Sequence, residues 1–219
     1  MTYVYIDGLN LYHHIKRRLR GRGKWLDLQA LADRLVDSAR RADLVRYFTA
    51  RVAVFDGDPG PSMRQDVYLR ALRTLPRLTI HFGTMAVRKK MVRLSNPPPG
   101  AGRFAEASIA EEKGSDVNLA THLVFDAARN RFDSAVVVTN DTDLAEPIRL
   151  VTTEVGKRIT VVYPAARPAG TWRQLPEARL VRLWPETILK SQLPDPVPTH
   201  SGPVSRPMSW RWGPAEPLS

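Results

Sequence analysis

Short apolar runs that alternate with helically spaced apolar residues constrain the fold of this chain more than any other feature of its sequence. Residues 3–6, 135–139 and 159–163 are runs of mostly apolar side chains. Runs of this length are typical of strands that are buried on both faces. Because segments of helical periodicity lie between the strands, the pattern predicts an α/β fold in which a mostly parallel sheet is covered by flanking helices.

The expected elements follow one another from the first residues to about residue 163. Asp27 and Ser115 are suitable caps for two of the helices, and the fixed φ angle of Pro61 suits the first turn of a third. The sequence predicts strands over residues 3–6, 44–54, 78–82, 135–139 and 159–163, and helices over residues 9–19, 28–36, 61–75, 115–129 and 144–155.

A β-hairpin insertion is expected in the middle of the chain. Met85 to Leu94 and Phe104 to Ile109 are rich in β-forming residues, and the loop 95–102 between them contains prolines and glycines. Two such strands joined by a proline-stiffened loop predict a hairpin that projects from the sheet.

The composition changes near residue 191, where proline, serine and glycine replace the apolar periodicity. A segment of this kind buries too little surface to offset the entropy of ordering it. We therefore interpret residues 1–190 as one domain and residues 191–219 as a flexible tail. Trp210 and Trp212 leave a second interpretation open, in which the tail docks on a partner or folds back onto the domain.

The chain is strongly basic, with 33 Lys and Arg against 22 Asp and Glu and a net charge of +11. This excess favours a polyanionic partner such as nucleic acid. The sequence has no cysteine, which excludes disulfides, thiolate zinc sites and thiol nucleophiles. No apolar run approaches the roughly 18 residues of a membrane span, and no leader pattern is visible at the start, so we expect a soluble, cytoplasmic protein without membrane contact.

Acidic residues fall where two predicted strands end. Asp7 follows the first strand, and Asp141 and Asp143 follow the strand over residues 135–139. The carboxyl ends of parallel strands form the edge of the sheet at which ligands bind, so these carboxylates should meet there. Asp116 lies on the apolar face of a predicted helix and should point into the same crevice, which Glu112 can also reach.

Clustered carboxylates repel one another unless a cation neutralises them. Oxygen ligands without cysteine or paired histidine suit Mg²⁺ or Mn²⁺, which can activate water for attack on a phosphodiester. Each acid also has an ordinary interpretation: Asp143 can cap the next helix, and Asp116 can complement a helix dipole. We interpret five further aspartates as solvated surface charges: Asp27, Asp33, Asp37, Asp126 and Asp133.

Three segments in order resemble the NYN domain, a family of the PIN-like nuclease superfamily. They are Tyr5-Ile6-Asp7-Gly8-Leu9-Asn10-Leu11-Tyr12, Lys113-Gly114-Ser115-Asp116-Val117-Asn118-Leu119-Ala120 and Val138-Thr139-Asn140-Asp141-Thr142-Asp143-Leu144. The resemblance runs from about residue 2 to residue 163. It implies a Rossmann-like, PIN-like fold and an acidic pocket that binds Mg²⁺ or Mn²⁺ and cleaves RNA, and we expect an endonuclease.

Matched residue by residue, the resemblance implies a role for four acids and one amide. The acids are Asp7, Asp116, Asp141 and Asp143, as metal ligands and catalytic residues, and the amide is that of Asn10, at the substrate. A further acid of PIN-like enzymes has no unambiguous counterpart here; Glu112 is the candidate and Glu111 the reserve. Some family members bind RNA without cutting it.

Two basic segments are candidates for contact with RNA phosphates. The first segment also contains an aromatic ring that can stack on a base, and it directly follows the helix that begins beside Asp7. Its candidate residues are Lys16, Arg17, Arg18, Arg20, Arg22, Lys24 and Trp25. The second, on the expected hairpin, contains Arg88, Lys89, Lys90 and Arg93. A solvated charge run is the alternative for each, and we interpret His13 and His14 as ordinary surface histidines.

Three classes of function remain. A metal-dependent ribonuclease acting on single-stranded or structured RNA is favoured, because the acids converge where a parallel sheet binds ligands. A non-catalytic RNA-binding module or scaffold would use the same basic surface. A phosphatase or nucleotide-binding enzyme is disfavoured, because the sequence has no glycine-rich phosphate loop and no second aspartate two residues after Asp7. Homo-oligomer formation is left open.

Overall fold

A computed structural model describes residues 1–36, 41–54, 57–98, 100, 102–175 and 177–211. Its strands form one seven-stranded sheet in the order β4-β3-β2-β1-β5-β6-β7. Every neighbouring pair is parallel except β3 and β4. The strands are β1 (Thr2–Asp7), β2 (Leu44–Ala50), β3 (Leu78–Arg93), β4 (Phe104–Lys113), β5 (Ser134–Val138), β6 (Arg158–Tyr163) and β7 (Arg179–Arg182). The predicted α/β fold with a mostly parallel sheet is confirmed.

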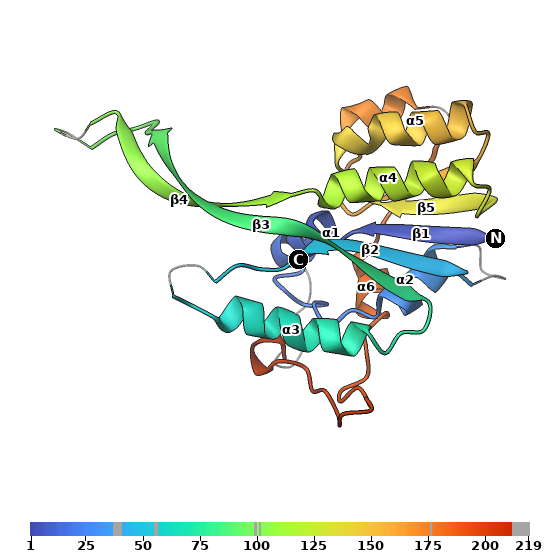
Figure 1. The fold of residues 1–219 in the computed structure, drawn as a ribbon, viewed down its shortest axis with the longest axis horizontal. Helices are drawn as coiled ribbons and strands as arrows, with labels where there is room; N and C mark the ends of the chain where they lie inside the picture. Colours follow the sequence, from blue (N-terminus) through green and yellow to red (C-terminus); the bar gives the residue numbers. More distant parts are fainter. Residues whose placement is uncertain (37–40, 55–56, 99, 101, 176, 212–219) are drawn as a thin grey trace.

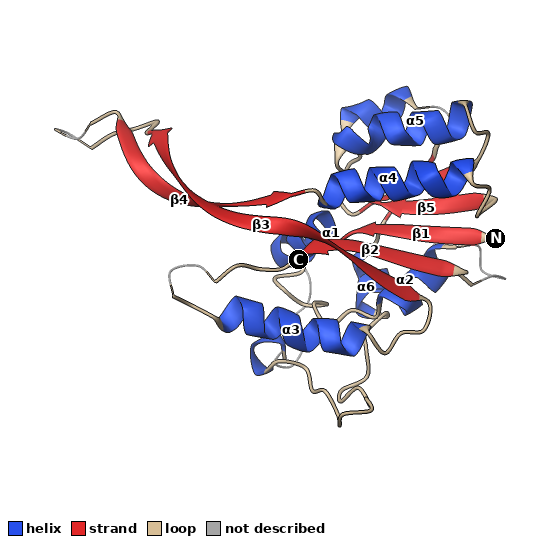
Figure 2. Ribbon diagram, viewed as in Figure 1, coloured by secondary structure: helices blue, strands red, loops and turns tan. Residues whose placement is uncertain are grey.

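The helices form a layer on each face of this sheet (Figures 1 and 2). On one face, α1 (Gly8–Arg18), α2 (Leu28–Leu35), α3 (Gly60–Leu72) and α6 (Pro185–Leu189) contribute side chains to the same core as the even-numbered side chains of β1, such as Val4 and Ile6. On the other, α4 (Ser115–Ala128) and α5 (Ala145–Thr153) pack against Tyr5 and Val137. Because both faces are covered, the central strands are apolar on both sides, as the sequence indicates.

The strand order reverses direction at β1. The chain passes from β1 to β2 and β3 on one side, and β5, β6 and β7 follow on the other side. In register, Ile6 of β1 lies between Tyr47 of β2 and Val138 of β5. This arrangement leaves a crevice outside the carboxyl ends of β1 and β5, which is where ligands bind in sheets of this kind.

The first strand of the hairpin is a continuation of β3 and not a separate strand. Residues 78–83 of β3 pair with β2, and residues 84–93 continue without a break to pair with β4. The expected division of this segment into two strands is therefore wrong, whereas the expected hairpin is confirmed and projects beyond the sheet (Figure 2). Strand β7 and helix α6 are elements that the sequence pattern did not predict.

Of two predicted helix caps, Asp27 is confirmed and Ser115 is wrong. The Asp27 side chain accepts hydrogen bonds from the backbone N–H groups of Gln29 and Ala30, as a cap of α2 should. Ser115, in contrast, is the first residue of α4 and not its cap. Gly114 precedes it with a φ angle of 93°, and Glu112 Oε1 accepts from the Ser115 N–H at 2.9 Å. A carboxylate three residues earlier therefore takes the capping role expected of the serine.

Asp126 is buried, and the interpretation of this residue as a solvated surface charge is wrong. Its carboxylate accepts hydrogen bonds from the Tyr5 hydroxyl at 2.7 Å, from Arg46 at 2.8 Å and from Arg131 at 2.9 Å. The helical period places it beside Leu119 and Leu123 on the face that packs against the sheet, where paired cations compensate its charge. Of the other aspartates in that group, Asp33 pairs with Arg77, and Asp37 lies outside the described residues.

Residues 191–211 pack against the domain, contrary to the expected flexible tail. Leu193, Val197 and Val204 are buried within the core below α1, α2 and α3. The Trp210 ring packs against Tyr68 with the ring centroids 5.9 Å apart. Isolated apolar residues among prolines have no periodicity, but these three join the same core as the buried side chains of the helices. The interpretation in which the segment folds back is therefore correct for Trp210, while Trp212 lies outside the described residues.

Within the described part of the chain, no helix has both the length and the apolar character needed to cross a membrane.

Candidate functional site

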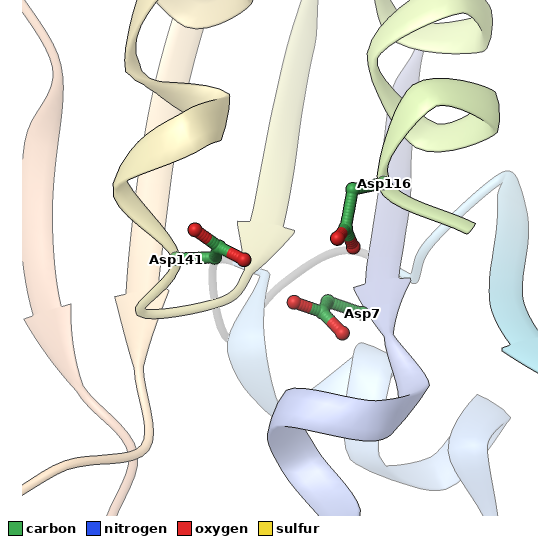
Figure 3. Close-up of side chains that lie close together, drawn as sticks. All are labelled: Asp7, Asp116 and Asp141. Carbon is green, nitrogen blue, oxygen red and sulfur yellow. The ribbon is translucent and has the colours of Figure 1, made fainter. Parts of the chain in front are cut away.

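Three carboxylates meet at the carboxyl ends of β1 and β5 (Figure 3). Asp7 ends β1, Asp116 lies in the first turn of α4, and Asp141 lies in the loop after β5. Each offers an oxygen atom, and these oxygens lie within 4.8 Å of one another. Figure 3 shows the three side chains pointing toward a common space. Of the acids that the sequence placed at this edge, these three are the ones whose oxygens the structure brings together.

Asp7 is fixed from two sides. Its Oδ1 atom accepts from the Asn10 N–H at 3.0 Å, so Asp7 is the N-cap of α1. The following residue must be small, because a Cβ at Gly8 would lie 2.5 Å from the Tyr47 ring and 2.6 Å from the Phe48 carbonyl oxygen. The Asp-Gly pair therefore lets α1 begin directly against β2 while the acid faces the crevice.

Thr139 connects the acids of the two strands. Its hydroxyl donates to Asp7 Oδ2 at 2.8 Å and accepts from the Asp141 N–H at 3.0 Å. Thr139 is fully buried. Sequence reasoning missed this role, although a hydroxyl at the last position of an apolar strand, just before the acids, was a signal that could have indicated it.

Asp141, and not Asp143, acts as the local cap. Asp141 Oδ1 accepts from the Asp143 N–H at 3.0 Å and so begins the short 3-10 helix Thr142–Leu144. Asp143 lies in the first turn of this helix, near enough to Asp116 to raise the pKa of that carboxyl group. It is outside the group of three oxygens, so a ligand role for Asp143 stays a prediction.

The two glutamates considered as a further acid lie on β4. Glu112 is close to Asp116 and contributes to the raised pKa of that residue, but its Oε1 atom is engaged with the Ser115 N–H. Glu111 is ion-paired with Lys90 along the hairpin. Glu112 therefore lies beside the acidic cluster, whereas Glu111 joins the two strands of the hairpin through its ion pair.

The acidic cluster carries negative charge that no cation among the described residues neutralises. Burial raises the pKa of Asp7 to about 6, and the charges of Asp116 and Asp141 act in the same direction; the hydrogen bonds from Asn10 and Thr139 oppose them. Asp116 also has a raised pKa, first because of its burial and then because of Asp141. No described residue forms an ion pair with any of these three carboxylates. The donor set therefore fits a hard divalent cation, whose ligand distances are about 2.1 Å for Mg²⁺.

The basic residues after Asp7 lie along α1 and in the turn that follows it. Lys16, Arg17 and Arg18 form the last turn of α1, and Arg20 and Arg22 lie in the turn that follows. Lys24 lies over the rings of Tyr12 and Trp210, at 5.8 and 5.9 Å from their centroids. Arg17 and Arg18 line a cavity together with Asn10 and Asn140, the neighbours of the acidic cluster, so these two cations lie next to the crevice.

Trp25 is not a stacking surface for bases. It is 1% exposed, and its indole N–H donates to the Pro194 carbonyl at 2.9 Å. Its ring packs against both Tyr68 and Trp210, which also contact each other. The expectation that it binds substrate is wrong, because the C-terminal segment covers it.

The hairpin cations are partly neutralised by acids on the same hairpin. Lys89 pairs with Glu106, and Lys90 pairs with Glu111. Asn10 is likewise engaged within the protein, since its side-chain oxygen accepts from the Asn140 N–H at 3.2 Å. A direct contact of these residues with substrate stays a prediction, and for Asn10 the structure shows a role in holding the loop after β5.

Comparison with known proteins places this site in a family. A model of the NYN domain matches residues 1–178. The chain belongs to the NYN domain family. The matched region contains all three segments on which the resemblance was based, so that prediction is confirmed.

Two further proteins are similar to this NYN domain in different ways. The chain is 32% identical to the 6-hydroxy-3-succinoylpyridine 3-monooxygenase HspA of Pseudomonas putida, over 95% of this chain and 75% of HspA. A crystal structure of a protein of unknown function from Vibrio parahaemolyticus is similar with a TM-score of 0.54 and 14% identity, over 84% of this chain and 93% of the other. The second likeness shows that the two proteins share a fold.

Proposed function

We propose that this NYN domain is a metal-dependent ribonuclease that hydrolyses phosphodiester bonds in RNA. The observation that supports it most is the group of three carboxylates at the carboxyl ends of β1 and β5, with basic residues of α1 beside it. Membership of the NYN family points the same way. An acidic centre next to a basic surface suits a phosphodiester substrate, because the cations bind the backbone and the acids hold the ion.

In this proposal Asp7, Asp116 and Asp141 hold Mg²⁺ or Mn²⁺, with Asp143 and Glu112 next to them. When bound, such an ion activates water and stabilises the charge that develops on the phosphate. Thr139 keeps the Asp7 carboxylate in place through the hydrogen bond to Oδ2 and fixes the start of the Asp141 loop. Because both Asp7 oxygens accept hydrogen bonds, the carboxylate is held in one orientation.

Digestion of RNA tests the proposal directly. Wild-type protein with Mn²⁺ should shorten a mixed RNA pool and should linearise a circular RNA if it acts as an endonuclease. Asp141→Asn should lose at least a hundredfold in rate. Asp133→Asn is the matched control, because Asp133 is an exposed aspartate just before β5, at the opposite end of the same sheet.

Metal binding is measured separately by calorimetric titration with Mn²⁺. Asp116→Asn and Asp141→Asn should each weaken binding, while Asp133→Asn should not. Unchanged affinity in both site variants would remove the metal centre from the proposal. RNA binding without cleavage by wild type, with Mn²⁺ bound, would instead assign the protein to the non-catalytic members of the family.

A second candidate function rests on the identity with HspA, which extends over nearly the whole chain. A monooxygenase acting on a hydroxypyridine that carries a carboxylate would need molecular oxygen and a reductant. The three-carboxylate donor set argues against it, since oxygen-activating iron centres typically combine one carboxylate with two histidines. Incubation with 6-hydroxy-3-succinoylpyridine, oxygen and NADH, followed by mass spectrometry, tests it. Because ring carbon 3 already bears the succinoyl group, hydroxylation there must break the bond to that group, so the appearance of a dihydroxypyridine and of the released four-carbon side chain would establish this candidate.

A further inference from the structure

A cavity of about 410 Å³ opens beside α1, on the side of the loops that follow β5 and β6. Its lining is polar and basic, with Pro164 and Ala165 forming the far wall. The polar residues of the lining are Asn10, His13, His14, Arg17, Arg18 and Asn140. The cavity is large enough for a phosphate group together with part of a nucleoside.

The sequence of α1 explains why one face of the helix forms this wall. The lining residues of α1 stand at positions 10, 13, 14, 17 and 18, which is the spacing of one helix face. Leu11, Ile15 and Leu19 follow the same period on the other face and are buried in the core. Helix α1 therefore turns an apolar face to the sheet and a face of imidazole, guanidinium and amide groups to the cavity.

The cavity is positively charged and has hydrogen-bonding capacity that the described residues do not use. No ion pair joins Arg17 or Arg18 to an acid within the described ranges. The His14 Nε2 atom is buried and has no hydrogen-bond partner among the described groups. Burial, with the nearby charges of Arg18 and Arg182, lowers the pKa of His14 to about 4. The imidazole is therefore neutral at pH 7 and presents one donor and one acceptor.

The cavity and the acidic cluster share a wall. The Asn10 N–H donates to Asp7, and the Asn10 side chain accepts from the Asn140 N–H. Asn140 directly precedes Asp141, and its side-chain oxygen accepts from the Ala169 N–H at 3.1 Å, which orients its NH₂ group for donation to a ligand. Asn10 and Asn140 thus lie between the negatively charged cluster and the positively charged cavity.

We propose that this cavity is a phosphate subsite that holds a nucleotide phosphate next to the bond cleaved in the acidic cluster. The inference rests on the proposed ribonuclease function for its substrate class. A phosphate fits because Arg17 and Arg18 supply charge-assisted donors, and the histidines and the Asn140 amide supply neutral ones. A ligand that occupies both sites would place one phosphate on cations and the next at the metal-binding acids. The subsite would thus set the register of RNA in the crevice.

Binding of a small probe in EDTA tests the subsite without any cleavage. Wild-type protein should bind adenosine monophosphate and, more weakly, inorganic phosphate in calorimetric titrations. The double variant Arg17→Ala/Arg18→Ala should weaken the binding of adenosine monophosphate at least tenfold, and His14→Ala several-fold. Arg129→Ala is the control, because it removes one exposed cation at the far end of α4. Equal binding by wild type and the double variant, or no binding of either probe at millimolar concentration, would overturn the proposal.

RNA binding by the inactive Asp141→Asn protein shows which phosphate is held. Oligonucleotides with a 5′-phosphate and with a 5′-hydroxyl are compared in the presence and absence of the double substitution. A loss confined to the 5′-phosphorylated RNA would identify a terminal phosphate, and an equal loss would identify an internal one; no loss in either would contradict the subsite. For an internal phosphate, the log–log salt slope should fall by up to about 1.4, or roughly 0.7 per lost contact.

Failure of the subsite and failure of the nuclease proposal give different results. Binding of adenosine monophosphate through Arg17 and Arg18 without cleavage of RNA would support the phosphate subsite and contradict the nuclease proposal. An active nuclease whose double variant shows unchanged KM and unchanged nucleotide binding would contradict the subsite. With both proposals correct, the double variant should raise KM about tenfold while kcat stays within a few-fold of wild type.

Discussion

Asp7 is the residue at which stability and function conflict most clearly. It is 4% exposed and lies beside two further carboxylates. Two hydrogen bonds hold it in place but do not compensate its burial, because its pKa remains raised to about 6. The charged side chain therefore destabilises the metal-free fold, and a divalent cation would relieve that cost.

Removing one acid should stabilise the metal-free protein. We expect Asp116→Asn to increase the free energy of unfolding in EDTA by about 1 kcal/mol, which corresponds to a rise of about 2–4 °C in Tm. In excess Mn²⁺ the order should reverse, since the variant has lost a ligand and gains less from binding. Thermal unfolding in both conditions is the measurement, and a lower Tm of the variant in EDTA would contradict a repulsive cluster.

The stability of the metal-free protein should depend on the ionisation of Asp7. Its pKa is about 6 in the fold and near 3.8 in the unfolded chain. Between these values the folded state binds a proton at Asp7 that the unfolded state does not bind, so the contribution of Asp7 to stability is greatest below pH 4 and falls as the pH rises through 6. Relative to Asp7→Asn, wild type should lose up to roughly 3 kcal/mol over this range. Urea unfolding at several pH values measures the difference; a constant difference would contradict the raised pKa.

Helix α4 is held to the sheet by a charged group as well as by apolar packing. Leu119, Leu123 and Ala127 are buried against the strands. In the same layer, Asp126 accepts hydrogen bonds from Tyr5 of β1 and from Arg46 of β2. Because Asp116 lies in the first turn of α4, this attachment also determines where the central acid of the site lies.

Neutralising Asp126 should destabilise the fold strongly. Asp126→Asn leaves the Arg46 guanidinium, whose side chain is 12% exposed, without its counter-charge, at an expected cost of about 3 kcal/mol. Asp133→Asn removes an exposed ion pair and should cost less than about 1 kcal/mol. Urea denaturation of the two variants gives the comparison. Similar costs would show that the buried pair contributes no more than a surface pair.

The whole molecule is completed by its C-terminal segment. Residues 191–211 pass below α1, α2 and α3, and their apolar side chains join the same core as β1 and β2. The segment also forms backbone hydrogen bonds with the loop that precedes α2, from Asp27 N–H to Ser191 and from Leu193 N–H to Trp25. It therefore belongs to the folded unit, although the match to the NYN domain ends at residue 178.

Two substitutions within this segment test whether its buried side chains contribute to stability. Leu193 is 4% exposed and Met208 is 74% exposed. Leu193→Ala should cost about 2–4 kcal/mol because it removes buried methyl groups and leaves a cavity. Met208→Ala should change stability by less than about 0.5 kcal/mol. Denaturant unfolding measures the free energy of unfolding of both variants. An unchanged value for Leu193→Ala would support the flexible-tail interpretation.

Much of the central sheet and of the acidic cluster was predictable from local pattern. Runs such as residues 3–6 and 135–139 are apolar because both faces of those strands are buried, and this signal needs no knowledge of distant residues. The position of Asp7 and Asp141 directly after such strands then implies that they meet, because parallel strands end at the same edge. Asp116 joins them because the helical period turns it toward the sheet.

The tertiary structure alone decided which polar and aromatic side chains are buried. Asp126 lies on the apolar face of its helix, but the groups that compensate its burial, Tyr5 and Arg46, are distant in the chain. Trp25 lost its expected role because Pro194 and Trp210 cover it. The cavity beside α1 likewise needs Asn140 and Pro164 to close its far side. Contacts between distant segments leave no signal in the local periodicity of a sequence. The sequence by itself therefore determined the central strands and the positions of the acids, whereas long-range packing determined which side chains contact these elements.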